Sequence, residues 1–281
     1  MKHKVHPELI TNPINVVVVG AGGTGSRVIE GLACLHRAIK AKGHPFGLQV
    51  TVIDPDTVSE ANVGRQAFYP CDVGHSKAHT LVNRVNMALN GEAIWNASAT
   101  MLTAETGLYA AHIVIGAVDN RKARLSILRA LENAGGGNRY WLDLGNRVAD
   151  GQVVLGEVTS RKRKTDDPER LPHAGELYPE LIDPSLEDLD DAPSCSLAEA
   201  LEKQALFINP AVCVQAMNLL WLLLTKGELE YHGAFINLEF GTVLPLRVDP
   251  AQWARFGVVR NGKKQRAVPA SKKRKAALAT A

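Results

Sequence analysis

The chain has 281 residues, of which 46% are hydrophobic, 22% charged and 5% aromatic. The hydrophobic fraction excludes wholesale disorder, and at about 150 residues per domain the length predicts one large domain or two small ones. The net charge of +3 is unevenly placed, because residues 255–281 hold nine Lys or Arg and no acid, against 23 basic and 29 acidic residues elsewhere. The body is therefore acidic, and the overall charge does not indicate a nucleic-acid-binding domain.

Strands and helices alternate along the first half of the chain. Residues 14–19 (INVVVV) are a continuous β-branched run, typical of a strand buried on both faces in a parallel sheet. Residues 26–42 carry apolar positions at helical spacing. Similar patterns predict strands at 48–53, 94–98, 112–115 and 140–144, and helices at 77–89 and 121–133. This alternation predicts an α/β, Rossmann-like, doubly wound and mainly parallel sheet.

The second half is less regular. Residues 152–158 are consistent with an additional strand, and residues 160–194 form a polar, proline-containing crossover connection with no clear period. Two helices are expected at 196–206 and 210–224, followed by a C-terminal antiparallel hairpin at 234–240 and 243–248. We expect one domain over residues 1–254 and a basic, disordered tail over residues 255–281.

Membrane and secretory signals are not expected. The apolar run from Ala211 to Leu224 is shorter than the roughly 20 residues that cross a bilayer, and the N-terminal MKHKVHPELITNP lacks an apolar core. No two cysteines form a CxxC pair, which favours a reducing cytoplasm and argues against zinc. Cys34 and Cys213 occur in apolar helical stretches and are expected to pack in the core.

A glycine-rich turn is the first chemical signal. The sequence Gly20-Ala21-Gly22-Gly23-Thr24-Gly25 follows the first strand directly and opens the first helix. Glycine is needed where the backbone turns tightly and approaches a phosphate, and the helix N-terminus offers unpaired N–H groups to the anion. The turn predicts nucleotide binding but does not distinguish ATP from NAD. Asp54, which ends the second strand 29 residues beyond Gly25, suits the ribose of either.

The polar residues that follow favour ATP. Asp56, Asn62, Arg65 and Gln66 come directly after Asp54. An arginine and an asparagine here serve no purpose in hydride transfer, whereas they suit charge that develops on a triphosphate. Lys77 offers a second cation. Asp119 ends a strand at the carboxyl edge of the sheet, where a single carboxylate suits Mg²⁺ that also binds phosphate oxygens.

These segments resemble the ThiF/MoeB/HesA superfamily, the adenylating domain shared with ubiquitin-activating enzymes. The matching stretches are GAGGTGS (20–26), DPDTVSEANVGRQ (54–66), VGHSK (73–77) and VDNRKAR (118–124). The resemblance covers roughly residues 14–250. It implies that Asp54 holds the ribose and that Asn62, Arg65 and Lys77 engage the triphosphate. It also implies that Asp119 binds Mg²⁺, with Asn120 and Arg124 lining the same site.

The resemblance further implies a reaction and partners. Such enzymes join the C-terminal glycine carboxylate of a ubiquitin-like, β-grasp protein to AMP and release pyrophosphate. Cys195, in APSCS between the crossover connection and a predicted helix, is the expected nucleophile for a following thioester. A homodimer is also implied, although the arginine that the family supplies from its N-terminal segment has no counterpart in the 13 residues before the first strand.

The short N-terminus, the absence of zinc motifs and the segments 193–200 and 206–209 resemble the ThiF-family protein of the PRTRC system. That resemblance implies a small ubiquitin-like protein and a JAB-type metalloprotease as partners. Three other functions stay open. They are a non-catalytic nucleotide-binding adaptor, activation of a small molecule, peptide or tRNA base, and an NAD oxidoreductase. The basic tail is expected to be a solvated segment, and the alternative is weak, salt-dependent contact with nucleic acid or with an acidic partner.

Overall fold

The computed structural model describes residues 1–161, 169–186 and 205–259. Within these ranges the strands are β1 (His3–Lys4), β2 (Ile14–Val19), β3 (Leu48–Ile53), β4 (Asn96–Ser98), β5 (Ile113–Gly116), β6 (Arg139–Asn146), β7 (Asp150–Val158), β8 (Glu228–Leu229), β9 (Tyr231–Asn237) and β10 (Thr242–Arg247). The α-helices are α1 (Glu8–Thr11), α2 (Gly23–Ala41), α3 (Lys77–Leu89), α4 (Arg121–Asn133), α5 (Ala174–Leu177), α7 (Ile208–Lys226) and α8 (Pro250–Ala254). Short 3₁₀ turns are η1 (Glu60–Asn62), η2 (Pro70–Asp72), η3 (Pro179–Ile182) and η4 (Pro184–Leu186).

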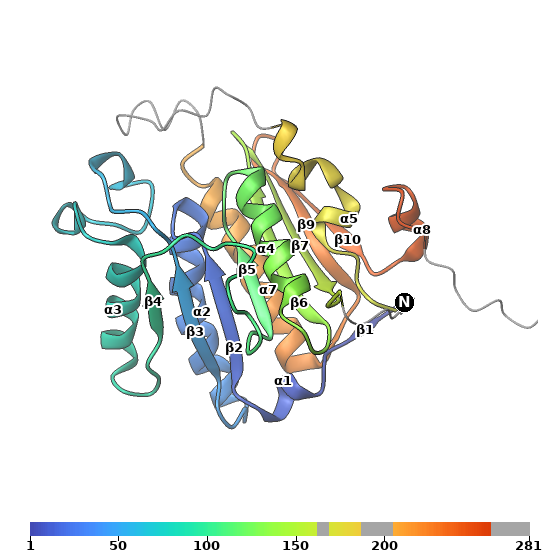
Figure 1. Ribbon diagram of the computed structural model, residues 1–281, viewed down its shortest axis with the longest axis horizontal. Coiled ribbons are helices and arrows are strands. Elements are labelled where there is room, and N and C mark those ends of the chain that lie inside the picture. The colour runs from blue at the N-terminus through green and yellow to red at the C-terminus, as the bar shows by residue number, and fades with distance from the viewer. Residues whose placement is uncertain (162–168, 187–204, 260–281) are drawn as a thin grey trace, which may run out of the picture.

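Eight strands form one mixed sheet in the order β10-β9-β7-β6-β5-β2-β3-β4 (Figure 1). β2 pairs in parallel with both β3 and β5, and the parallel region continues to β4 on one side and to β6 on the other. β7, β9 and β10 extend the sheet by antiparallel pairing. The predicted doubly wound, mainly parallel sheet with a C-terminal antiparallel hairpin is confirmed, and β9 and β10 form the hairpin.

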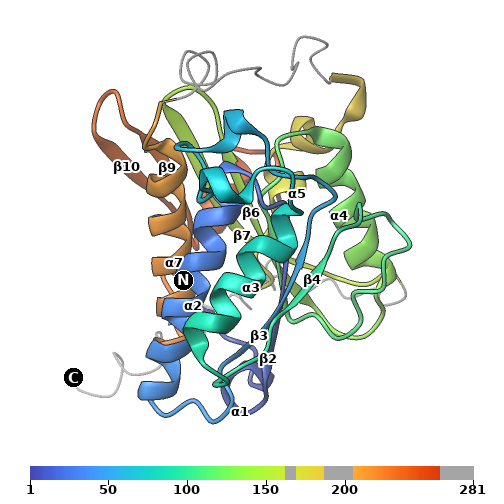
Figure 2. The ribbon, with the colours of Figure 1, turned by 90° about the vertical axis from the view of Figure 1, so that its left-hand side faces the viewer.

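Helices cover both faces of the sheet (Figure 2). α2 and α7 lie side by side on one face, and α4 lies on the other. Among the helices of the described residues, α7 is the one with the length and apolar content of a membrane span. It packs against α2 and against β6, β7 and β9, with Val212, Ala216 and Leu220 buried. This packing is typical of an interior helix of a globular domain.

Most predicted elements lie within a few residues of the observed ones, and the differences have local causes. α2 begins at Gly23 rather than at residue 26, because the glycine-rich turn itself enters the helix. β7 was expected only as an additional strand, and the structure inserts it between β6 and β9. The described part of the crossover, residues 169–186, is not without structure, because α5, η3 and η4 form there and η3 packs on α4. Most of the helix predicted at 196–206 lies outside the described residues.

Of the two cysteines expected to pack in the core, one is buried and the other is not. Cys213 is buried on α7, as expected, and burial raises the pKa of its thiol to about 12. Cys34 is exposed on α2, so the prediction that it packs in the core is wrong. The reason is the helical period: Leu32 and Leu35 lie on the buried side of α2, and residue 34 falls on its exposed side.

His232 is a fully buried histidine at the antiparallel end of the sheet. Its Nδ1 lies 2.7 Å from the carbonyl oxygen of Leu155, and the indole Nε1 of Trp253 donates to its Nε2 at 2.9 Å. The neutral imidazole with its proton on Nδ1 satisfies both bonds, whereas a protonated ring cannot accept from Trp253. Burial, as the largest cause, lowers the pKa of His232 to about 4.

This geometry predicts acid sensitivity of the fold. The unfolded chain takes up a proton on His232 below its ordinary pKa of about 6.5, whereas the folded chain does so only near pH 4. The free energy of unfolding therefore falls as the pH drops through this window, by up to about 3 kcal/mol from this group. The glutamine in His232→Gln does not titrate. Between pH 7 and pH 4.5 this variant will therefore lose less of its free energy of unfolding than wild type does, as measured by denaturant unfolding. His79→Ala, which removes an exposed histidine, is the control and will lose as much stability as wild type. An equal loss in wild type and in His232→Gln would contradict the role of His232.

Candidate functional site

The glycine-rich turn lies where the winding of the sheet reverses, between the carboxyl ends of β2 and β5. Gly20 has a φ of +93°, which side chains rarely adopt, and a Cβ there would lie 2.5 Å from the carbonyl oxygen of Ala117. A Cβ at Gly25 would overlap the carbonyl oxygen of Gly20. The missing side chains thus let the turn contact the end of β5 and the start of α2. In open α/β sheets this crevice is the place where ligands bind.

The N-terminus of α2 is open for an anion. Gly22 is the residue that precedes the helix, and no side chain caps the first turn. A Cβ built on Gly22 would meet nothing within 4 Å among the described residues, in contrast to Gly20 and Gly25. Unpaired N–H groups at a helix start, together with the helix dipole, favour a phosphate. The turn therefore has the space and the donors that a phosphate needs.

Asp54 stands directly beside the turn. One carboxylate oxygen accepts from the backbone N–H of Ala21 at 2.6 Å, and the other from that of Asp56 at 2.9 Å. The side chain is buried, and this burial raises the pKa of Asp54 against the lowering effect of the two hydrogen bonds. Each oxygen keeps a second lone pair for a hydroxyl group. Asp54 thus shapes the turn and still offers acceptors to a ribose.

Asp56 and Lys77 form an ion pair at the same edge. The Lys77 Nζ lies 3.0 Å from a carboxylate oxygen of Asp56, and the Lys77 N–H donates to the Asp56 carbonyl at 3.0 Å. A bridge between Thr57 and Ser76 holds the two segments together. The Lys77 side chain is 9% exposed and that of Asp56 is 62% exposed. The fold therefore brings the predicted lysine to the segment after β3, although 20 residues separate them in sequence.

Asn62 ends η1, and Arg65 and Gln66 lie in the turn that follows it. The Asn62 side chain accepts from the backbone N–H of Ser59 at 3.0 Å and so closes η1. Next to them, the N–H of Ala67 donates to the hydroxyl oxygen of Ser26 on α2 at 3.1 Å. The Gln66 side-chain oxygen is buried and has no hydrogen-bond partner among the described residues. This segment is thus fastened to the start of α2, with a buried acceptor left for a donor.

Arg65 and Asp119 approach each other across the crevice. The Arg65 guanidinium is half-buried, and burial lowers its pKa, while the negative charge of Asp119 acts in the opposite direction. Asp119 is exposed, two residues past Ala117 at the end of β5. The predicted arginine and the predicted metal-binding carboxylate therefore lie at the same edge of the sheet, close enough to interact electrostatically.

Asn120 and Arg124 also have defined places at the start of α4. Asn120 is the N-cap of α4: its oxygen accepts from the Ala123 N–H at 2.8 Å, and its amide donates to Asp119 at 3.1 Å. Arg124 is buried, and its Nε donates to an oxygen of the fully buried Asp143 at 3.1 Å. Asn120 thus orients Asp119, whereas Arg124 is engaged in a buried ion pair that reaches β6.

Sequence reasoning missed a polar cluster behind the glycine-rich turn. The Thr24 hydroxyl donates to Asn209 at 2.9 Å and lies 3.2 Å from the side-chain oxygen of Asn146. A Cβ on Gly23 would lie 2.6 Å from the Asn209 amide nitrogen. Asn146 ends β6 and Asn209 opens α7, so strand-end and helix-start polar residues were the available signal. Cys195 lies outside the described residues.

The fold and this site define a class: a Rossmann-like α/β protein with a glycine-rich anion-binding turn at the reversal point of its sheet. The model of the ThiF family matches residues 10–244, and the chain belongs to this family. The match spans the turn, the segment after β3 and the end of β5. It confirms the superfamily resemblance drawn from the motifs.

The chain also resembles solved structures. The chain is similar to the crystal structure titled E. coli MccB with succinimide, at a TM-score of 0.55 and 18% identity, over 86% of this chain and 65% of that one. A second similar structure is TcdA (CsdL), with a TM-score of 0.34 and 25% identity over 42% of this chain and 45% of that one. The chain thus spans less than two thirds of either structure. A search of curated proteins gave no match.

Proposed function

We propose that this protein binds ATP with Mg²⁺ and adenylates a carboxylate. The observation that carries the proposal is the open, uncapped start of α2 beside the buried Asp54, at the edge of the sheet where Asp119 follows β5 and Arg65 lies within electrostatic range of it. A cation, an exposed carboxylate and unpaired backbone N–H groups at one crevice suit a triphosphate and its metal ion. Membership of the ThiF family supports this reaction class.

The residues present fit the nucleotide. Open space at Gly22 accepts a phosphate, and the remaining lone pairs of Asp54 accept ribose hydroxyls. Asn62, Arg65 and Lys77 would bind the triphosphate, and the buried Gln66 oxygen would accept a donor from the nucleotide. Asp119 would hold Mg²⁺, which supplies charge neutralisation on the phosphates.

In the proposed reaction an oxygen of the substrate carboxylate attacks the α-phosphorus in line. The bond from the α-phosphorus to the bridging oxygen breaks, and pyrophosphate leaves with its electron pair, so that the product is a mixed anhydride of the acid and AMP. Arg65 and Lys77 stabilise charge that moves onto the leaving pyrophosphate. The turn and Asp54 position the nucleotide, and positioning of this kind supplies much of the rate enhancement.

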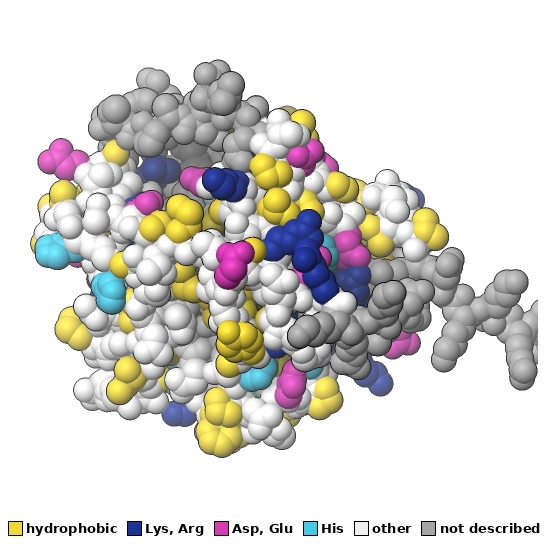
Figure 3. Space-filling view, viewed as in Figure 1, with side chains coloured by type: hydrophobic (Ala, Val, Ile, Leu, Met, Phe, Trp, Pro, Cys, Tyr) yellow, Lys and Arg dark blue, Asp and Glu magenta, His cyan; other side chains and the backbone are white. Residues whose placement is uncertain are grey.

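The acceptor class rests on the sequence resemblance. We propose the C-terminal carboxylate of a small ubiquitin-like, β-grasp protein, with the PRTRC system as the setting, a JAB-type metalloprotease as a further partner, a homodimer as the assembly and the cytoplasm as the location. On the face in Figure 3, basic side chains lie beside acidic ones rather than in one continuous band.

Cys195 remains the proposed nucleophile for a second step. Its thiolate would attack the acyl carbon of the anhydride, form the thioester and release AMP. Under this proposal Cys195→Ala leaves adenylation intact and blocks the thioester. A thioester that persists in Cys195→Ala excludes this residue as the nucleophile.

The first test needs no knowledge of the acceptor. Calorimetric titration with ATP and Mg²⁺ will show binding, whereas NAD under the same conditions will show none. NAD binding without ATP binding would overturn the proposal. Pyrophosphate exchange with a β-grasp protein as acceptor then separates an enzyme from an adaptor, since an adaptor binds ATP without exchange. Exchange with a small acid, peptide or tRNA instead would keep the chemistry and replace the acceptor.

A further inference from the structure

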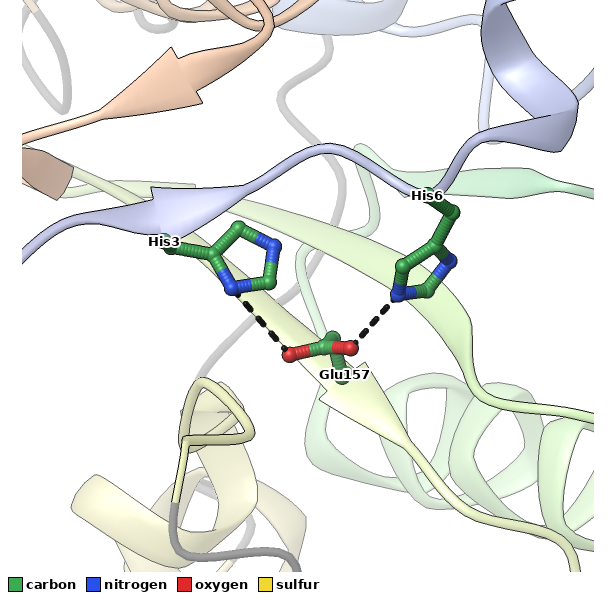
Figure 4. Close-up of side chains that lie close together, drawn as sticks. All are labelled: His3, His6 and Glu157. Atoms are coloured by element: carbon green, nitrogen blue, oxygen red, sulfur yellow. Dashed lines mark hydrogen bonds and ion pairs between the residues drawn. The ribbon is translucent and has the colours of Figure 1, made fainter.

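A second group of reactive side chains lies far from the glycine-rich turn. His3 and His6 come from the N-terminal segment, and Glu157 comes from the end of β7 (Figure 4). The His6 Nε2 lies 2.7 Å from one carboxylate oxygen of Glu157, and the His3 Nδ1 lies 3.6 Å from the other. Both imidazoles thus turn a ring nitrogen toward the same carboxylate, from opposite sides.

The three ligand atoms have the spacing that a small cation needs. They all lie within 4.8 Å of one another. Metal–ligand bonds of about 2.0–2.2 Å in a tetrahedral arrangement place neighbouring ligand atoms about 3.4 Å apart. The His6 nitrogen lies 2.7 Å from one Glu157 oxygen and the His3 nitrogen 3.6 Å from the other; these distances bracket this value, so small side-chain adjustments would accommodate an ion.

Neighbouring groups orient these ligands. The His3 Nε2 lies 2.7 Å from the Tyr140 hydroxyl, and in the tautomer that donates to that oxygen the His3 Nδ1 is unprotonated. His6 stacks on the Tyr140 ring with a centroid distance of 4.3 Å. The backbone N–H of Leu171 donates to Glu157 at 2.7 Å. Outer partners of this kind fix the tautomer and the direction of metal ligands in known sites.

The burial of Glu157 also suits a cation. Glu157 is only 2% exposed. A buried carboxylate requires partial or full positive charges around it, and a divalent ion between it and two imidazoles supplies such charge.

The group opens onto a cavity of about 520 Å³, lined by His3, His6 and Glu157 together with Lys2, Glu8 and Asn138. Glu157 pairs with Tyr140 near the start of β6, the edge of the sheet opposite the glycine-rich turn. An ion here would keep a position open for water or another ligand. It would also be independent of the nucleotide site.

We propose that His3, His6 and Glu157 bind a divalent transition-metal ion, Zn²⁺, that ties the N-terminal segment to β7. Two imidazoles, one carboxylate and one open position form a ligand set that Zn²⁺ accepts. The expectation that the chain lacks a zinc site rested on CxxC pairs and missed the His-x-x-His spacing of residues 3–6. Glu157, more than 150 residues away in sequence, could not be associated with it.

The test is a calorimetric titration of chelator-treated protein with Zn²⁺ at pH 7.5. Wild type will bind one ion, and Zn²⁺ will raise its melting temperature, because an ion that binds only the folded state stabilises it. His6→Phe keeps an aromatic ring for the stack on Tyr140 but removes the ligand, and Glu157→Gln keeps the shape of the side chain. Both will bind Zn²⁺ at least about tenfold more weakly than wild type.

His79→Ala is the matched control, because it removes an exposed imidazole on α3. It will bind Zn²⁺ as wild type does. The proposal is overturned if wild type binds no Zn²⁺, or if folded His6→Phe or Glu157→Gln binds it as tightly as wild type. If His6→Phe does not fold, Glu157→Gln alone decides.

Discussion

Replacing Asp119 by alanine will abolish ATP-dependent pyrophosphate exchange, with a loss of at least about a hundredfold, and will weaken the binding of ATP with Mg²⁺. Asp119 is the exposed carboxylate at the carboxyl edge of β5, and its charge acts on Arg65 across the crevice. Without it, the proposed site loses its metal ligand and the phosphates lose part of their charge compensation. Pyrophosphate exchange with the acceptor protein measures the loss of the reaction, and calorimetry measures the weaker binding of ATP with Mg²⁺.

Stability must be separated from function in this variant. The Asp119 side chain accepts a hydrogen bond from Asn120 at 3.1 Å and is exposed, so Asp119→Ala will unfold at nearly the same denaturant concentration as wild type. Glu230→Ala, which removes an exposed carboxylate paired with Lys2, is the matched control and will keep both ATP binding and exchange. Unchanged exchange in folded Asp119→Ala would remove Asp119 from the proposed mechanism.

Replacing Asp143 by alanine will cost about 3–5 kcal/mol of the free energy of unfolding. Asp143 is fully buried, and its carboxylate accepts from the Arg124 guanidinium at 3.1 Å. A further contact of that guanidinium, to the carbonyl oxygen of Leu144, is long at 3.4 Å. Removal of the carboxylate thus leaves a buried positive charge with poor compensation. Denaturant unfolding of wild type and Asp143→Ala measures the difference.

Two further variants test whether the loss of stability in Asp143→Ala comes from the unpaired buried charge. Glu92→Ala breaks an ion pair with Arg37 whose two side chains are about half exposed, and it will cost less than about 1 kcal/mol. The double variant Arg124→Met, Asp143→Leu removes both buried charges and will be more stable than Asp143→Ala. A double variant that is less stable than Asp143→Ala would contradict the explanation.

The sequence was most informative where the signal is local. The apolar run at 14–19 predicts the bounds of β2 to the residue. A continuous run of β-branched residues is typical of an interior strand of a parallel sheet, and polar or turn residues mark its two ends. The predicted bounds of α3 and α4 also match, and polar side chains cap both helices, Ser76 and Asn120. The spacing of Gly20, Gly22 and Gly25 predicts the turn, because glycine is needed where a side chain would overlap neighbouring backbone.

The parallel sheet also brought the predicted site together in an expected way. Strands β2, β3 and β5 all end at one edge, so Gly22, Asp54 and Asp119, each just past a strand, meet there. This reasoning needs only the order of parallel strands. The order of the strands does not predict the partner of Arg124, which the resemblance placed in the same site. In the structure Arg124 pairs with Asp143, because packing between α4 and β6 decides which acid this arginine contacts.

By itself, the sequence thus determined the fold class, the glycine-rich turn and the polar residues at the strand ends, since short-range periodicity and backbone requirements encode these features. Tertiary structure alone decided the insertion of β7 between β6 and β9, the support of Thr24 by Asn209, and the convergence of His3 and His6 on Glu157. Apart from the pairing of β7 with β6, these contacts join residues more than 75 positions apart. No local pattern specifies them, because they arise only when packed elements bring distant side chains within bonding distance.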